Sequence, residues 1–363
     1  MSAEQGHLSK IRSQIDEIDT QLLELISRRA RLAQKTAQIK QAESDKVVYY
    51  RSEREASIRQ RVRTANTGPL PDDDIGRIFQ EIMSSCRSLE QRLKVAHLGP
   101  RGTFTESATE RHFGQAIDTI PLDTIDAVFR EVESGGSSYG VVPIENSSEG
   151  GVSHTLDMFI QSSLSICGEV ELRIHQNLMS NERELSQIKK IYSHQQSLGQ
   201  CRRWLERNLP SVETEAVESN AQAAKIASIK AGSAALGGKS AAAAYGLSIL
   251  ASGIEDEPNN TTRFLVIGGE PVPPTGWDKT SLLLSSKNEP GALFNLLEPL
   301  ARYGVSMTRI ESRPAGIGVW EYVFFVDVEG HAEEESVASA IKEIKQNALL
   351  LKVLGSFPRA MSR

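Results

Sequence analysis

The chain has few cysteines and no long apolar run. Among its 363 residues are only three cysteines, Cys86, Cys167 and Cys201, too far apart in sequence for a CxxC pair or a zinc knuckle. This spacing predicts a reducing compartment and no metal site. No stretch approaches the roughly 18 apolar residues of a membrane span, and the N-terminus MSAEQGHLSK lacks the apolar core and cleavage site of a secretion signal. We therefore expect a cytoplasmic protein without a membrane segment.

Positive charge is not in excess either. The sequence has 41 Lys and Arg against 47 Asp and Glu, which gives a net charge of -6, and this balance argues against a nucleic-acid-binding surface. Internal repeats and low-complexity tracts are also missing from the sequence. The length allows two or three domains with more than one hydrophobic core.

Residues 1 to about 92 are rich in charge, and their pattern predicts helices. Apolar residues recur every three to four positions from Leu8 to Ile39, a spacing that predicts one buried stripe on a long helix over residues 8–40. Two further helices are predicted over residues 52–64 and 72–91. The first helix is too long for a small domain to cover unaided, which favours an intertwined dimer.

Arg29 occupies the apolar stripe. An unpaired buried charge is costly, and no acid lies one helical turn away, so the position favours an anionic ligand. Lys40 lies on nearly the same face, about 16 Å along the helix, which suits a small molecule with two carboxylates. Arg12 points about 100° away, so it joins such a site only from a second copy. The alternative is a solvated cation at the edge of the stripe.

Glu90 is predicted to lie on the apolar face of the third helix, one turn after Cys86. Desolvation raises the pKa of a carboxyl group, so Glu90 is expected to stay protonated and to donate a hydrogen bond to a ligand oxygen. The alternative is a helix-end glutamate in water.

From about residue 95 to 268, short apolar strands alternate with helices, which predicts an α/β domain. Polar motifs follow the strands: GPRGTFTE, PIENSSEG, SHQQSLGQC and ESNAQAA, whereas NNTTRF lies at the start of a strand. Binding sites in open α/β sheets lie at the carboxyl ends of strands, so the distribution indicates two lobes around a cleft. Ordinary turn and cap chemistry is the alternative for GPRGTFTE and PIENSSEG, and an exposed strand end is the alternative for NNTTRF.

A proline-rich spacer leads to a final domain with the order βαββαβ, which predicts a ferredoxin-like fold. This domain has no recognisable catalytic pair. It fits a small-ligand pocket or an oligomer interface, with a pure packing module as the alternative.

Taken together, the motifs resemble the bifunctional chorismate mutase/prephenate dehydratase family across nearly the whole chain. The resemblance implies an all-α chorismate mutase domain at 1–92, a two-lobed α/β prephenate dehydratase domain at 94–268 and a ferredoxin-like ACT regulatory domain at 279–358. It also implies a homodimer, with pairing into tetramers left open, and no cofactor.

For the mutase, the resemblance implies that Lys40 and Glu90 stabilise the breaking ether oxygen of chorismate. The rearrangement to prephenate is pericyclic, so positioning and electrostatics suffice for catalysis. The expected substrate-binding residues are Arg12 of the partner chain, Arg29, Arg54 and Glu55.

For the dehydratase, the resemblance implies that Thr262 donates a hydrogen bond to the leaving hydroxyl of prephenate, with Glu145 as the candidate proton source. Which of the two gives the proton stays open. Arg263 is expected to hold the pyruvyl carboxylate. Further substrate-binding residues are Thr103, Asn146, Ser147, Ser219 and Asn220. His194 receives no catalytic role, because the family's SHPQA reads SHQQS here.

For the ACT domain, the resemblance implies an inhibitory phenylalanine site at a dimer interface. The expected residues are Gly291, Ala292, Leu293, Glu311, Ser312 and Arg313.

The sequence leaves open whether the dehydratase also uses arogenate, whether tyrosine affects it and whether prephenate passes directly between the sites. The alternatives are a two-lobed sensor without catalysis and an enzyme in which one activity has decayed.

Overall fold

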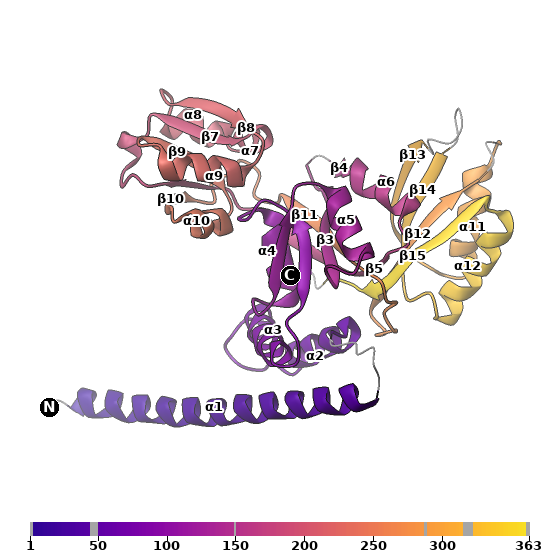
Figure 1. Cartoon of the computed structure of the whole chain (residues 1–363), viewed down its shortest axis with the longest axis horizontal. Helices are drawn as coiled ribbons and strands as arrows, with labels where there is room; N and C mark the ends of the chain where they lie inside the picture. The colour runs from indigo at the N-terminus through magenta and orange to yellow at the C-terminus, as the bar shows by residue number, and fades with distance from the viewer. Residues whose placement is uncertain (1–2, 44–49, 149, 287–288, 315–321, 361–363) are drawn as a thin grey trace. The chain divides into compact units, whose positions relative to one another are not determined.

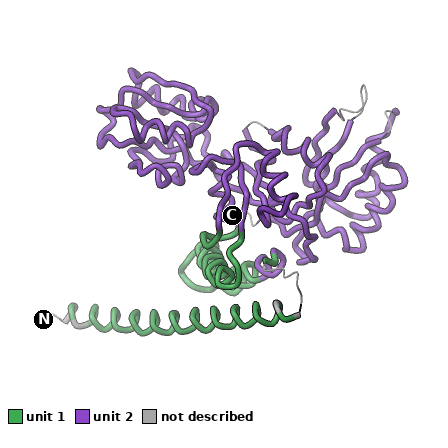
Figure 2. The backbone as a smooth tube through the Cα atoms, in the orientation of Figure 1, with its two compact units in different colours: residues 1–51, 58–93, 113–117 green, residues 52–57, 94–112, 118–363 purple. Residues whose placement is uncertain are grey.

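The computed structural model describes residues 3–43, 50–148, 150–286, 289–314 and 322–360. The chain divides into two compact units, which Figure 2 colours separately. The first unit comprises Met1–Arg51, Ile58–Leu93 and Phe113–Ile117. The second comprises Ser52–Ser57, Lys94–His112 and Asp118–Arg363.

The N-terminal part is helical, as predicted. Its helices are α1 (Ala3–Glu43), α2 (Ser52–Thr64) and α3 (Asp72–Ser88) (Figure 1). Three aspartates in the first turn of α3 place negative charge at the positive end of the helix dipole. Within the first unit, the rings of Tyr50 and Phe113 pack in a tilted arrangement with their centroids 5.0 Å apart. The buried Arg87 donates a hydrogen bond of 2.7 Å to the Phe113 carbonyl oxygen.

The apolar stripe of α1 is not buried within one chain. Ile15, Leu22 and Leu25 are 51%, 50% and 60% exposed. In contrast, Ala37, near the C-terminal end of the helix, is buried. A single chain therefore leaves most of the predicted stripe uncovered, because α1 is longer than the helix that packs against it.

Lobe 1 of the α/β region is a mixed sheet with helices. Its elements are β1 (Lys94–Leu98), α4 (Phe104–Phe113), β2 (Asp118–Leu122), α5 (Ile125–Glu133), β3 (Tyr139–Asn146), β4 (Gly150–Gly151), α6 (Ser153–Gln161), β5 (Ser165–Arg173) and β11 (Thr261–Gly268). The strand order is β2-β1-β3-β11-β5, with β4 beside β3. The first three strands run parallel, whereas β11 pairs antiparallel with both neighbours.

Lobe 2 is inserted between β5 and β11. Its elements are β6 (Asn177–Ser180), the short 3-10 helix η1 (Leu185–Gln187), β7 (Lys190–His194), α7 (Gln195–Gln200), α8 (Arg202–Asn208), β8 (Glu213–Val217), α9 (Asn220–Ile229), β9 (Ser233–Gly237), α10 (Lys239–Tyr245) and β10 (Ser248–Ser252). The strand order is β10-β6-β9-β7-β8. Two connections, residues 174–176 and 253–260, join the lobes, so the predicted two-lobed arrangement is confirmed.

The lobes also touch where α4 and α10 begin. Ser107 donates a hydrogen bond of 2.9 Å to the Ser240 hydroxyl. Gly102 has a φ of +84°, and a Cβ there would lie 2.9 Å from the Ala241 Cα. Only glycine fits this position, because both its backbone conformation and the close approach of lobe 2 exclude a side chain.

The C-terminal domain has the predicted ferredoxin-like order. Its elements are β12 (Asp278–Ser285), α11 (Ala292–Arg302), β13 (Met307–Pro314), β14 (Tyr322–Glu329), α12 (Glu335–Asn347) and β15 (Leu350–Pro358), with strand order β13-β14-β12-β15. One face of the sheet packs under α11 and α12 through Leu282 and Val326. The other face shares a hydrophobic core with lobe 1, in which Leu283 and Phe325 join Ile144.

Among the described residues, no helix is long and apolar enough to cross a membrane. The three cysteines are free thiols, and each is buried.

Candidate active sites

The two lobes enclose a cavity of about 420 Å³, here called the interlobe cavity. Several helices begin at its wall: α4 after Thr103, α9 after Ser219 and α10 after Gly238. Helix N-termini present unsatisfied N–H groups and a partial positive charge, so they favour an anion. No Arg or Lys is found among the described residues that line this cavity. The groups that can hold an anion there are neutral donors, helix dipoles and the His194 ring, and the lining also includes the acids Asp123 and Glu218.

Asn146 and Thr262 face each other in the cavity. The Asn146 Nδ2 donates a hydrogen bond of 2.8 Å to the Thr262 Oγ1. The Asn146 Oδ1 accepts a bond of 2.9 Å from the backbone N–H of Ser148, which fixes the orientation of the amide. Because Thr262 Oγ1 accepts from Asn146, its own proton stays available for a ligand in the cavity.

Five of the residues predicted for the dehydratase line the cavity: Thr103, Asn146, Ser219, Asn220 and Thr262. The side chain of Asn220 is committed to the protein. Its Oδ1 accepts from Ser193 and from the His194 backbone, and its Nδ2 donates to the Ser197 hydroxyl at 2.8 Å. Asn220 thus holds the junction of β7 and α7, where His194 lies and also lines the cavity.

Ser147 lies behind the cavity wall. Its hydroxyl oxygen accepts a bond of 3.0 Å from the Thr261 backbone, and its hydroxyl donates to the Asn260 Oδ1 at 3.4 Å. This places Ser147 as a support for Asn260, which does line the cavity.

Glu145 and Arg263, the other two predicted residues, do not line this cavity. Successive side chains of a strand point to opposite faces, so Arg263 points away from the face that Thr262 occupies. The pairing of β3 with β11 shifts register between Arg263 and Phe264, and this bulge places Glu145 opposite Arg263. Both residues form ion pairs with the C-terminal domain instead: Glu145 with Arg309, and Arg263 with Asp327.

The sequence interpretation missed Gln176 and Asn260. Both are buried in the cavity wall, and Gln176 is 1% exposed. The Gln176 Oε1 and the Asn260 Nδ2 have no hydrogen-bond partner within the structure. One acceptor and one donor therefore remain for a ligand. Asn260 directly precedes the TTRF motif, so its position in the sequence marked it as a candidate site residue. Gln176 lies in a connection between lobes and belongs to none of the motifs.

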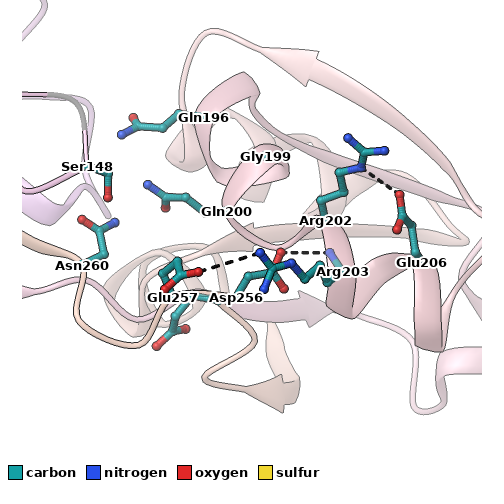
Figure 3. Close-up of a pocket in the computed structure, with 11 residues that line it drawn as sticks. Ser148, Gln196, Gly199, Gln200, Arg202, Arg203, Glu206, Asp256, Glu257 and Asn260 are labelled. Carbon is teal, nitrogen blue, oxygen red and sulfur yellow. Dashed lines mark hydrogen bonds and ion pairs between the residues drawn. The ribbon is translucent and has the colours of Figure 1, made fainter.

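A second hollow of about 690 Å³ adjoins the interlobe cavity and shares Gln196, Gln200 and Asn260 with it. Figure 3 shows its charged residues pairing among themselves: Arg202 with Glu206 at 2.8 Å, and Arg203 with Glu257 at 3.9 Å. Because these charges are already paired, the hollow offers less to an anion than the interlobe cavity does.

In the first unit, Glu90 lies beyond the end of α3, in a turn where its N–H donates to the Arg87 carbonyl oxygen. The predicted position within the helix is therefore corrected. Its Oε2 is buried and has no hydrogen-bond partner within the structure. Burial raises the pKa of Glu90 despite the positive charges of Lys40 and Arg87, which is the predicted direction.

The cationic residues predicted for the same site differ in exposure. Arg29 and Lys40 are half-buried on α1, whereas Arg12 is exposed farther along the helix. At the start of α2, Arg54 is exposed and Glu55 is buried.

The residues predicted to bind phenylalanine occupy two elements of the C-terminal domain. Gly291, with a φ of +81°, precedes α11, whose first residues are Ala292 and Leu293. Glu311, Ser312 and Arg313 lie on β13. Arg313 faces lobe 1, where it pairs with Asp157 at 3.1 Å, whereas Ser312 is exposed. Ser312 and Arg313 therefore point to opposite faces of β13.

Family comparisons agree with this architecture. The chain matches the Chorismate mutase type II model over residues 11–91, the Prephenate dehydratase model over 95–272 and the ACT domain model over 280–346. It is 52% identical over 363 residues to the bifunctional chorismate mutase/prephenate dehydratase of Pseudomonas aeruginosa, covering 99% of this chain and 100% of that protein. The chain belongs to the bifunctional chorismate mutase/prephenate dehydratase family.

Other relatives support the assignment. The enzyme of the same name from Stutzerimonas stutzeri is 50% identical over 363 residues, with 99% of this chain and 100% of that protein covered. A solved prephenate dehydratase from Arthrobacter aurescens, in complex with L-Phe, superposes with a TM-score of 0.69 at 35% identity, covering 74% of this chain and 90% of that one.

The bifunctional chorismate mutase/prephenate dehydratase assignment makes this chain an enzyme of phenylalanine biosynthesis with both activities, rather than a binding protein without catalysis. The matched models follow the order of the elements in the fold: helices, then the two lobes, then the ferredoxin-like domain.

Proposed function

We propose that the interlobe cavity is the prephenate dehydratase site and that Asn146 and Thr262 act at its centre. The reaction expels the ring hydroxyl of prephenate together with carbon dioxide and leaves phenylpyruvate. A hydroxide is a poor leaving group, so a hydrogen-bond donor at that oxygen lowers the barrier. The hydrogen bond from Asn146 to Thr262 carries this proposal, because it directs the remaining threonine proton toward the cavity.

The lack of Arg and Lys among the described residues of the cavity suits the carboxylate that departs from prephenate. The departing carboxylate becomes neutral carbon dioxide in the transition state, so a strong ion pair to it would favour the substrate and slow the reaction. Helix N-termini and neutral amides bind anions more weakly than a guanidinium does. The start of α4 and the unpartnered groups of Gln176 and Asn260 are the proposed contacts.

For the mutase, we propose that Lys40 and a protonated Glu90 stabilise the ether oxygen of chorismate, with Arg29, Arg54 and Glu55 binding the substrate and Arg12 supplied by a second chain. The homodimer is supported by the exposed apolar stripe of α1, which an identical helix would cover. Burial of the Glu90 carboxyl supports its protonated form.

We further propose that the ACT domain binds phenylalanine and thereby inhibits the dehydratase. The L-Phe complex of the Arthrobacter aurescens relative supports this, and the predicted residues at Gly291–Leu293 and Glu311–Arg313 remain the proposed site. The proposed domain boundaries are 1–92, 94–268 and 279–358. A cytoplasmic location is proposed from the three free, buried thiols.

A coupled assay tests these assignments together. Purified full-length protein is given chorismate, and chorismate loss and phenylpyruvate formation are followed separately, with and without phenylalanine. We expect both reactions, with the second suppressed by phenylalanine. If added prephenate yields phenylpyruvate while chorismate is untouched, the mutase assignment of the helical part fails. If phenylalanine leaves both rates unchanged, the regulatory assignment fails.

A further inference from the structure

Two residues adjacent in sequence to the Asn146 and Thr262 pair are tied to the ACT domain. The Glu145 Oε2 lies 2.9 Å from the Arg309 Nε on β13. The Arg263 Nη1 lies 2.6 Å from the Asp327 Oδ2 on β14. Each strand that carries a proposed catalytic side chain is thus held, one residue away, by a charge of the ACT domain.

The strand register makes this connection direct. Between β3 and β11, Asn146 pairs with Thr262 and Glu145 pairs with Arg263. The first pair faces the interlobe cavity, and the second faces the ACT sheet. A backbone shift at the second pair must move the first, because adjacent residues of a strand share a peptide unit.

The Arg263 pair belongs to a buried ionic network. The side chains of Arg263, Asp327 and Glu169 are 11%, 7% and 1% exposed. Glu169 also lies 2.8 Å from the Arg263 Nε and 2.9 Å from the Lys279 Nζ. Although burial raises the pKa of Glu169, the charges of Arg263 and Lys279 outweigh it and hold that pKa below its usual value. Separating these charges would leave them unpaired in an apolar interface, so the strands and the ACT sheet move together.

Strand β13 contributes a second row of contacts. Its alternate residues Arg309, Glu311 and Arg313 all face lobe 1. Glu311 pairs with Arg309, and its carboxylate lies so close to Gly151 that a Cβ there would clash with it. Arg309 therefore stands between Glu311, a residue of the proposed phenylalanine site, and Glu145, the neighbour of Asn146.

We propose that Glu145 and Arg263 are positioning residues, through which Arg309 and Asp327 of the ACT domain set the geometry of the Asn146 and Thr262 pair. This rests on the proposed role of that pair in the dehydratase reaction. The ACT domain is then a structural part of the dehydratase site as well as a regulator. A ligand that displaces β13 changes the Arg309 contact with Glu145, and so changes the rate without entering the interlobe cavity.

The test compares Arg309→Gln, Glu145→Gln and the double variant in the full-length protein. Arg302→Gln is the matched control, because Arg302 lies in the same domain and forms ion pairs with Glu298 and Glu343, but makes no ion pair with the described residues of lobe 1. Dehydratase kcat, KM for prephenate, inhibition by phenylalanine, mutase rate and Tm are measured for each. Arg309→Lys keeps the positive charge and tests whether that charge restores the dehydratase rate.

We expect each single variant to lower dehydratase kcat about tenfold or more, with a smaller change in KM, since small misplacements of catalytic groups reduce rates strongly. The double variant should be no slower than either single one, because both remove the same contact. Phenylalanine should inhibit these variants less, Arg309→Lys should recover part of the rate, and Arg302→Gln should match the wild type.

Equal losses of mutase and dehydratase rate with a lowered Tm would overturn the proposal in favour of general destabilisation. An additive double variant, or a kcat close to wild type, would also overturn it. Thr262→Val separates a failure of the proposed dehydratase site from a failure of the proposed positioning role. If Thr262→Val is inactive while Arg309→Gln is unaffected, the proposed site stands and the positioning role fails. If Thr262→Val keeps full activity, the proposed site itself fails.

Discussion

The Asn146 amide donates a hydrogen bond of 2.8 Å to the Thr262 hydroxyl across 116 residues of sequence. Thr262→Val removes the hydroxyl and keeps the shape of the side chain. We expect it to lower dehydratase kcat by about 10²–10³-fold, the usual effect of losing one donor to a developing negative charge. Thr262→Ser should retain most of the activity, because it keeps the donor.

Thr261→Val is the matched control for this change. Thr261 is the preceding threonine on β11, and its hydroxyl donates to the Asn259 carbonyl oxygen instead of Asn146. Steady-state kinetics with prephenate should separate the two positions, while the mutase rate reports on folding. Equal losses at both positions would contradict the role assigned to Thr262.

Glu90 predicts a pH dependence of the mutase. Burial raises its pKa, so the carboxyl group stays protonated to a higher pH than an exposed glutamate. Only the protonated carboxyl group donates a hydrogen bond, so mutase kcat should fall as the pH rises through the raised pKa of Glu90. Glu90→Gln donates at every pH and should give a flat profile over the same range.

The pH profile of the dehydratase reaction, measured on the same samples, controls for unfolding. If the mutase profiles of wild type and Glu90→Gln coincide, Glu90 does not act through its proton.

Much of the fold could be predicted from the sequence because it rests on periodicity and element order. The helix over 52–64 was predicted with its observed bounds, and the ferredoxin-like order was readable from the alternation of apolar strands and helices. Residues that start helices or follow strands, such as Thr103 and Ser219, line the interlobe cavity because the carboxyl ends of strands converge at a cleft.

Two predicted site residues lie elsewhere for reasons that differ in kind. Strand alternation alone places Thr262 and Arg263 on opposite faces of β11, so the sequence already indicated that only one of them can line the interlobe cavity. The position of Glu145 depends on the bulge in β3, which no sequence signal marked. Gln176 is recognisable only once the two lobes are placed around the cavity.

The exposed stripe of α1 predicts that the mutase needs a second chain. Ile15→Asp places a charge at a position that is 51% exposed in one chain but buried in the proposed dimer. A buried unpaired carboxylate is strongly unfavourable, so we expect dissociation and loss of most mutase activity. Sedimentation and the chorismate assay measure the two effects.

Ile229→Asp is the control for Ile15→Asp. Ile229 is 78% exposed at the end of α9 and lies outside the stripe. It should leave both the assembly and the mutase rate unchanged. A fully active Ile15→Asp monomer would contradict a site built from two chains.

The contact between Gly102 and Ala241 predicts that dehydratase activity depends on close approach of the lobes. A Cβ at Gly102 would lie 2.9 Å from the Ala241 Cα, at a φ of +84°. Gly102→Ala should therefore push the lobes apart, raise KM for prephenate and lower kcat.

Gly135 has a similar φ of +76° but no atom within 4 Å of its Cβ position. Gly135→Ala thus carries the same backbone strain, about 1 kcal/mol, without the clash. Kinetics and thermal unfolding of both variants separate strain from closure. Similar losses of Tm with a kinetic defect only in Gly102→Ala would assign that defect to the lobe contact, whereas normal kinetics in both would mean that the cavity works without it.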